Sequence, residues 1–201
     1  MTFEFVWSVL TFCFVMSAVP GPNNAIAFSA GLNYGFLNTM PYMLGASMSI
    51  SLMFAAVAWG LGEFFAAFPE FYGYMRYVGM AYILYLSWKI AAAPVRGENN
   101  SQKRNTPERR PTFLNGVLFQ WVNPMIWLIA VAGVTSCLGN NLQFVRLFFL
   151  CAAFFVMCFL CLVAWGFCGN LSSRLIRSPR VLQAINLFMG LLLASSVLTL
   201  F

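Results

Sequence analysis

The sequence contains no histidine and no aspartate, and its only acidic side chains are five glutamates. Histidine and aspartate supply most of the proton shuttles, hydrolytic triads and metal ligands of enzymes. The glutamates lie in the amino-terminal segment, in a short turn and in a polar linker, at Glu4, Glu63, Glu70, Glu98 and Glu108. No apolar stretch therefore carries a carboxylate at membrane depth that could couple transport to protons. We predict that the protein is not an enzyme and holds neither a metal nor another cofactor.

Charge of either sign is scarce, because only 8% of the residues are charged while 61% are hydrophobic. The chain has a mean hydropathy of +0.80, and 22 of its 201 residues are phenylalanine. A helix needs about 20 apolar residues to cross a bilayer. The sequence therefore predicts an all-α integral membrane protein with the lipid bilayer as its surroundings and almost no room for a soluble domain. The net charge of +6 comes from span ends and one loop, so we expect no nucleic-acid partner.

The apolar stretches predict six transmembrane helices, at about 5–32, 41–61, 71–93, 113–138, 144–167 and 181–201. We expect short turns at 33–38 and 63–70. The only markedly hydrophilic segment is 94–112, which divides the chain into a first repeat, 1–93, and a second repeat, 113–201. Six spans place this basic linker on the same side as Arg174, Arg177 and Arg180. Because positive loops stay inside, the linker is expected to be cytoplasmic and both termini are expected to face outward.

Two of the predicted spans are interrupted by proline and amide side chains. The first carries Pro20, Gly21, Pro22, Asn23 and Asn24, and the fourth carries Gln120, Trp121, Asn123 and Pro124. Proline removes a helical hydrogen bond, and broken backbone at membrane depth must face protein or a water-filled cavity. Transporters build substrate sites from such discontinuous helices. A simple kink, or hydrogen bonding between helices, is the alternative explanation for these residues.

The first break suggests how a substrate would bind. A helix that resumes after Pro22 presents free amides and a partly positive end, which Asn23 or Asn24 could cap and which suits a carboxylate. An ammonium group could meet carbonyls left free before Pro20, or the ring face of Trp121. Because no span carries a compensating charge, we expect a small neutral amino acid rather than a dibasic or diacidic one.

Three correspondences between the halves suggest an inverted repeat. Residues 57–60 have the sequence Val-Ala-Trp-Gly, which recurs at 163–166, and the two breaks occupy matching spans, as do Gly79 and Gly190. Three spans in each half give the halves opposite orientations, as in alternating-access carriers. In the second span, Gly45 and Ser49, like Ser47 and Ser51, stand four residues apart and permit close helix packing. We predict packing or gating roles for Gly45, Ser49, Gly79 and Gly190, with plain tight packing as the alternative for the serines.

Cysteines and tyrosines form two further patterns. The spacing of Cys151, Cys158, Cys161 and Cys168 places them along one face of the fifth span. Such a stripe could bind a soft metal or exchange thiols, but cysteine also packs as a small apolar residue, which is the interpretation we favour. Tyr82 and Tyr85 of the third span are likewise expected to pack against lipid or the core.

The motif Pro20-Gly21-Pro22-Asn23-Asn24, together with Gly79 to Tyr82 and Gln120 to Pro124, resembles the LysE/RhtB family of amino-acid exporters. The doubled asparagine is most similar to its cysteine/O-acetylserine efflux branch. The resemblance covers the whole chain. It implies six spans, a location in the bacterial inner membrane with both termini periplasmic, and outward transport of amino acids or small derivatives. A lysine often follows the Asn-Pro of the fourth span in that family, whereas this chain has Met125. A passive pore, a membrane assembly subunit, an intramembrane enzyme and a soft-metal exporter are the alternatives, and homo-oligomers are possible.

Overall fold

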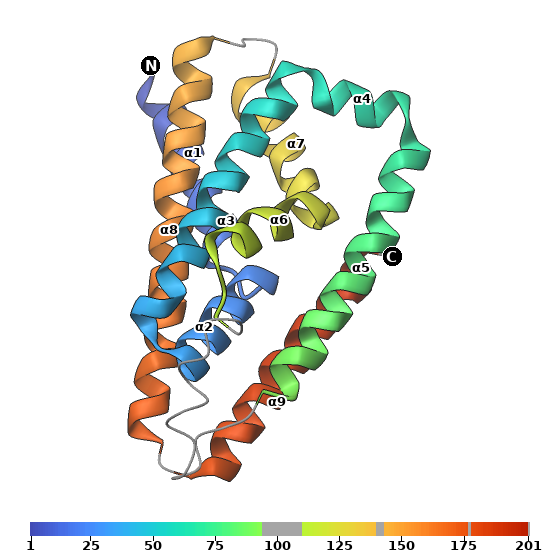
Figure 1. Cartoon of the computed structure of the whole chain (residues 1–201). Helices are drawn as coiled ribbons and strands as arrows, with labels where there is room; N and C mark the ends of the chain where they lie inside the picture. Colours follow the sequence, from blue (N-terminus) through green and yellow to red (C-terminus); the bar gives the residue numbers. More distant parts are fainter. Residues whose placement is uncertain (94–109, 140–142, 177, 201) are drawn as a thin grey trace.

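The computed structural model describes residues 1–93, 110–139, 143–176 and 178–200 (Figure 1). All regular structure in these residues is helical. In chain order the helices are α1 Phe3–Ala18, α2 Pro22–Tyr34, α3 Phe36–Ala56 with the π-helical turn η1 Val57–Leu61, α4 Gly62–Ala67, α5 Pro69–Ala91, α6 Phe113–Val122, α7 Pro124–Leu138, α8 Phe144–Leu175, and α9 Pro179–Ser195 with the 3₁₀ turn η4 Ser196–Leu200. Most of the predicted basic linker, at 94–109, and Arg177 lie outside the described residues.

Both predicted helix breaks are confirmed. The chain bends by 55° between α1 and α2, and by 75° between α6 and α7. In each case a proline, Pro22 or Pro124, takes the first helical position after the break. The preceding residues, Gly21 and Asn123, have extended backbones, as steric contact with a following proline favours. A proline there loses nothing, because the first amides of a helix have no helical acceptor.

Length and composition support up to five membrane spans in the described residues, whereas the sequence predicts six. Three are single helices that include α3, α8 and α9, and two are the bent pairs α1–α2 and α6–α7. Helix α5 has 23 residues and is long enough to cross a membrane. Its apolar sequence is interrupted by Glu70, Arg76 and Lys89 and by several tyrosines. The six-helix arrangement and the inverted repeat therefore stay predictions.

Several predicted boundaries are wrong. The turn expected at 33–38 is reduced to Gly35, whose φ of 88° suits a residue without a β-carbon. Helix α3 consequently starts at Phe36 and includes Pro41. The turn expected at 63–70 contains α4, and α8 runs on to Leu175, past the predicted end of the fifth span.

The packing of helices crosses the two halves of the sequence. Helix α8 of the second half packs along α1, α2 and α3 of the first half, and α3 also packs on α6. Helix α5 packs mainly on α9, and these two lie side by side along one flank (Figure 1). We call α5 and α9 the arm, and α1, α2, α3, α6, α7 and α8 the bundle. Each unit contains helices from both halves, so the halves are interleaved.

Glycines permit the closest contacts between the halves. A β-carbon on Gly45 of α3 would collide with the carbonyl of Phe113 in α6. A β-carbon on Gly79 of α5 would likewise collide with the chain at the second break, and one on Gly190 of α9 would collide with the backbone of α5 at Ser87. Further contacts of this kind join Gly31 to Gly166, Gly169 to Phe28, and Gly116 to Tyr42. Small residues at such contacts let helices in lipid approach closely.

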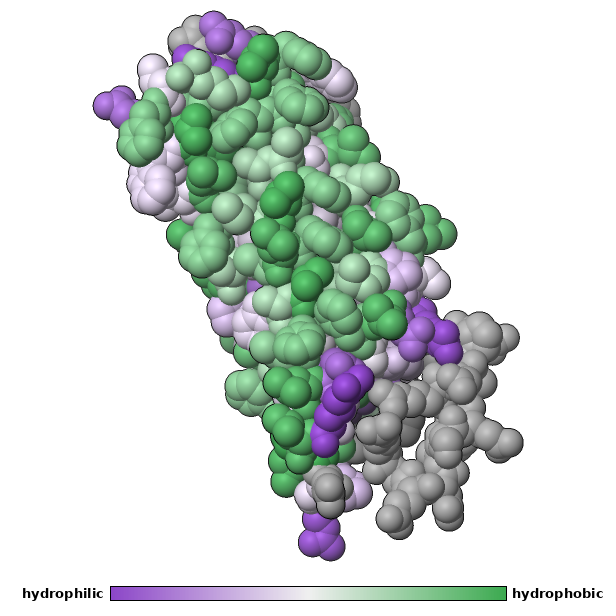
Figure 2. Space-filling model, turned by 90° about the vertical axis from the view of Figure 1, so that its left-hand side faces the viewer, coloured by the Kyte–Doolittle hydropathy of each residue, from purple (hydrophilic) through white to green (hydrophobic). Residues whose placement is uncertain are grey.

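The surface matches a membrane setting. On the face seen in Figure 2, apolar side chains cover the middle of the molecule and hydrophilic ones gather toward its two ends. Large apolar side chains of α8, such as Phe148, Leu160 and Phe167, are more than half exposed. A soluble monomer rarely exposes so extensive an apolar surface. These side chains are therefore placed to contact lipid.

Candidate functional site

A cavity of about 210 Å³ surrounds the first helix break. We call it the break cavity. None of the described residues that line it is charged, and its polar side chains are Ser17, Asn23, Asn24 and Asn123. Apolar side chains from the other elements complete the wall, namely Val15, Met16, Ile50, Met125, Ile126, Ile129, Phe154 and Cys158. The two breaks, far apart in the sequence, thus contribute to one neutral cavity.

The side chain of Asn24 forms hydrogen bonds with backbone carbonyls that the first break leaves without helical partners. Its Nδ2 donates to the carbonyl oxygens of Ser17 at 2.9 Å and Val19 at 2.8 Å. The prediction that carbonyls before Pro20 are free to hold an ammonium group is therefore wrong for these two. The prediction that Asn23 or Asn24 caps α2 is also wrong, because the N-cap is Gly21 and no side chain caps this helix.

The amino-terminal end of α2 borders the break cavity. Helix α2 has 13 residues and begins at Pro22 without a capping side chain. The N–H groups of Asn23 and Asn24 lie in its first turn, where no helical acceptor is available. The aligned peptide dipoles also make this end partly positive. Gly21, Pro22 and both asparagines line the cavity, so the helix end can receive an anionic group there.

The second break contributes a buried donor without a partner. Asn123 is only 1% exposed, and its Oδ1 accepts the N–H of Met125 at 3.1 Å, which caps α7. This leaves Asn123 Nδ2, which finds no acceptor among the described residues, and the same is true of the buried Ser17 Oγ. A buried polar group without a hydrogen bond costs about 1–3 kcal/mol. Both groups line the break cavity, so a ligand there could satisfy them.

A group of three polar side chains joins the two halves beside the break cavity. Asn23 and Gln120 exchange two side-chain hydrogen bonds of 2.9 Å each. The hydroxyl of Tyr42 donates to Asn23 Oδ1 at 3.1 Å. We call Asn23, Gln120 and Tyr42 the amide latch. Gln120 is fully buried and lines neither described cavity. Sequence reasoning missed Tyr42, because nothing local links it to the breaks.

The latch lies between the break cavity and a second cavity of about 290 Å³, which we call the linker-side cavity. Asn23 lines the former, whereas Tyr42 lines the latter. The linker-side cavity takes its name from Arg110 and Pro111, which lie at the end of the predicted linker, 94–112, and belong to the cavity wall. The hydrogen bond between Tyr42 and Asn23 therefore runs from one cavity wall to the other.

Three aromatic rings pack together beside the break cavity. Phe54 of α3 and Phe154 of α8 have ring centroids 4.6 Å apart, and Phe12 of α1 contacts both at 6.4 Å. We call these three residues the aromatic plug. Phe154 also lines the break cavity, and Phe12 precedes the break in α1. The plug thus lies on the side of the cavity from which α1 enters.

Other predicted site residues lie outside the cavity. Trp121 is 39% exposed and packs edge-on against Trp127 at 5.4 Å, so it does not offer its ring to the break cavity. Pro124 lies against Gly79. Ser49 is buried and donates to the carbonyl of Val117 across the contact of α3 with α6.

The cysteine stripe does not share one environment. Cys158 is buried and lines the break cavity, Cys151 and Cys161 are half-buried, and Cys168 is exposed. Within the described residues, no group of histidine, cysteine or acidic side chains is arranged to hold a metal ion.

A second reciprocal amide pair, which sequence reasoning missed, joins α2 to the arm. Asn33 and Asn186 exchange side-chain hydrogen bonds of 3.0 and 3.2 Å. Asn186 is fully buried and also donates to the carbonyl of Ala93 at 3.4 Å. Helix α2 is therefore tied to second-half helices near both of its ends.

Comparison with known proteins identifies relatives over the whole length. The model of a family described as LysE type translocator matches residues 14–200. The cysteine/O-acetylserine efflux protein of Escherichia coli O1:K1 / APEC is 24% identical over 201 residues, which covers 95% of this chain and 94% of the relative. The protein of that name from Salmonella choleraesuis (strain SC-B67) is 34% identical over 96 residues, or 46% of this chain and 48% of the relative. This match thus spans about half of the Salmonella relative. No solved structure matches the chain.

Proposed function

This chain belongs to the LysE type translocator family, and from that premise we propose that it exports small neutral amino acids from the bacterial cytoplasm. Membership makes it a transport protein rather than an enzyme, and its apolar helices make it a multi-pass membrane protein. The names of the relatives favour cysteine or O-acetylserine as substrate. The basic linker is cytoplasmic and both termini are periplasmic in this proposal, following the distribution of Lys and Arg.

The neutral break cavity with two unpaired donors is the observation that supports this proposal. The substrate carboxylate binds where Asn123 Nδ2, Ser17 Oγ and the first-turn amides of α2 border the cavity. Hydrogen bonds to a charged group are about twice as strong as neutral ones, so a carboxylate suits these donors.

The cavity also limits the side chain of the substrate. With about 210 Å³, it is smaller than the roughly 300–1,000 Å³ of sites for drug-sized ligands. Its lining offers no charge to compensate a second cation or anion, and an unpaired charge is costly away from water. A short, neutral side chain against Met125 and Ile126 fits these limits.

Transport requires that the cavity open to one side at a time. The amide latch closes the side toward the linker, and the aromatic plug closes the side toward the start of α1. Because the bundle combines helices of both halves, we propose that the arm moves against the bundle, rather than one half against the other. Breaking the latch exposes the substrate site to the cytoplasm, and parting the plug exposes it to the periplasm.

Export from cells tests the proposed function. Cells that express the protein are loaded with amino acids, and the amino acids in the medium and in the cells are profiled. We expect external cysteine or O-acetylserine to rise and the internal pool to fall. Ser17→Ala should reduce this export at normal membrane abundance. The control is Ser172→Ala, which removes a hydroxyl bonded within α8 and lining neither cavity. Selective export of lysine or arginine, or no change in any amino acid, would overturn the proposal.

A further inference from the structure

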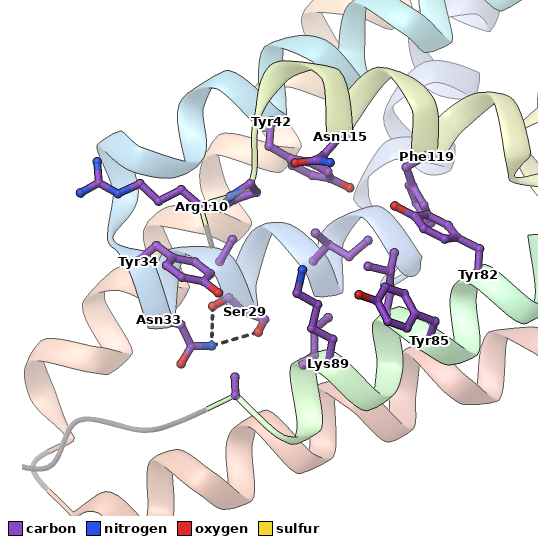
Figure 3. A pocket seen from close by; sticks show the side chains of 16 residues that line it. Ser29, Asn33, Tyr34, Tyr42, Tyr82, Tyr85, Lys89, Arg110, Asn115 and Phe119 are labelled. Carbon is purple, nitrogen blue, oxygen red and sulfur yellow. Dashed lines mark hydrogen bonds between the residues drawn. The ribbon is translucent and has the colours of Figure 1, made fainter. Parts of the chain in front are cut away.

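The linker-side cavity lies between the arm and the bundle (Figure 3). Its wall combines α5 of the arm with α2, α3 and α6 of the bundle. The lining is rich in polar groups, with four tyrosines, two cations, two asparagines and a serine, namely Tyr34, Tyr42, Tyr82, Tyr85, Lys89, Arg110, Asn33, Asn115 and Ser29. A cavity of about 290 Å³ with converging polar groups is a typical form of a binding site for a small molecule.

The described residues give this cavity a positive charge. Lys89 and Arg110 line it, and none of the described lining residues is acidic. Figure 3 shows the Lys89 side chain rising from α5 into the space opposite Ser29 and Asn33, whereas the Arg110 guanidinium points away. The guanidinium instead donates from Nη1 to Asn38 Oδ1 at 3.1 Å. Lys89 therefore provides the cation of the cavity, in contrast to the neutral break cavity.

Aromatic residues form the wall beside this cation. Tyr82 stacks on Tyr85, with ring centroids 6.3 Å apart, and contacts Phe119 at 5.9 Å. In Figure 3 the hydroxyls of both tyrosines point into the cavity. Tyrosine rings attract ammonium groups, and the hydroxyls can accept hydrogen bonds from them. The cavity thus offers a cation and an aromatic, hydroxyl-bearing wall, which are complementary to the two ends of a zwitterion.

We propose that the linker-side cavity is a second amino-acid site, in which Lys89 binds the carboxylate and the tyrosines face the ammonium group. This site rests on the proposed function, because it receives the substrate from the cytoplasm before the substrate reaches the break cavity. Its position also connects binding to the latch. Tyr42 lines this cavity and donates its hydroxyl to Asn23. A bound amino acid that competes for this hydroxyl weakens the latch from the cytoplasmic side.

Transport into everted membrane vesicles, which expose the cytoplasmic face, tests this site with radiolabelled O-acetylserine. For Lys89→Gln we expect an apparent KM about tenfold higher, the factor that about 1.4 kcal/mol represents, with little change in maximal rate. Lys89→Arg should restore most of the affinity. The matched control is Arg174→Gln, which removes the same charge from the exposed last turn of α8. An unchanged KM in Lys89→Gln would overturn the proposal.

Direct binding to the purified protein separates this site from the proposed function. The probes are O-acetylserine, its carboxamide, which lacks the carboxylate, and inorganic phosphate. Lys89→Gln should weaken the preference for the acid over the carboxamide and leave the part that the break cavity contributes, while Ser17→Ala should keep the part that depends on Lys89. If the wild-type protein transports nothing, this Lys89-dependent preference still supports the site and only the exporter assignment fails. No Lys89-dependent binding, or Lys89-dependent binding of phosphate without O-acetylserine, would overturn the site.

Discussion

Asn24 should stabilise the first helix break, and Asn24→Ala tests this directly. The variant removes two hydrogen bonds, to the carbonyls of Ser17 and Val19, from a side chain that is 5% exposed. The buried Ser17 carbonyl left without a donor costs about 1–3 kcal/mol, and the part-buried Val19 carbonyl costs less. Alanine has a higher helix propensity than asparagine, which offsets up to about 0.7 kcal/mol of this loss. We therefore expect the free energy of unfolding to fall by about 1–4 kcal/mol.

Denaturant titration of the purified protein in detergent micelles measures this loss. The control is Asn115→Ala, which removes an exposed side chain from the capping box of α6. Water can replace its hydrogen bonds, so we expect this change to cost about 1 kcal/mol or less. A loss for Asn24→Ala no larger than that of the control would show that the carbonyls before Pro20 find other donors. The assignment of Asn24 as the group that allows the break to be buried would then be refuted.

Three further changes test the packing, the latch and the cavity. Gly45→Leu should reduce the amount of folded protein in the membrane, because even a β-carbon at this position would collide with the backbone of α6. The control is Gly73→Ala, whose β-carbon would have no neighbour within 4 Å and which should leave the abundance unchanged. Asn23→Ala and Gln120→Ala should each slow export. Because the two side chains bond each other, the loss of export in the double variant should be clearly smaller than the sum of the two single losses. Fully additive losses would contradict the latch. Met125→Lys places a cation in the neutral lining of the break cavity. Export of O-acetylserine should therefore fall, and export of an acidic amino acid such as glutamate should rise. An unchanged substrate profile would contradict the position of Met125 in the cavity wall.

The breaks were predictable because proline acts locally. Pro22 and Pro124 cannot stand in the interior of a helix without removing a hydrogen bond, so the sequence alone indicates that a helix begins at each of them and locates both bends. Asn24 illustrates the limit of this reasoning. The sequence suggests that its side chain caps α2 at the substrate site, but the side chain bonds the backbone five and seven residues earlier. Whether a side chain turns toward a ligand or back to its own chain depends on bend geometry that composition does not encode.

The amide latch, the second amide pair and the arm could not be predicted. Tyr42 lies 19 residues from Asn23, and Asn186 lies 153 residues from Asn33. Such partners meet only through tertiary packing, which here interleaves the halves of the chain. Lys89 stands near the end of the predicted span 71–93, where a lysine is typical of an anchor at the lipid interface. Its place in a cavity depends on how α5 lies against α2, for which the sequence gives no local signal.

The central claim is that an amino acid binds in the break cavity, and substrate protection of a cysteine at Ser17 tests it most directly. Ser17→Cys nearly preserves the side-chain volume and is made after the six native cysteines are replaced. A small thiol reagent should label this cysteine, and O-acetylserine should slow the labelling in a saturable manner, whereas its carboxamide should not. A cysteine at Leu37, which is 79% exposed, serves as control and should react at a constant rate. Labelling at Ser17→Cys that is equally fast with and without O-acetylserine would contradict the claim.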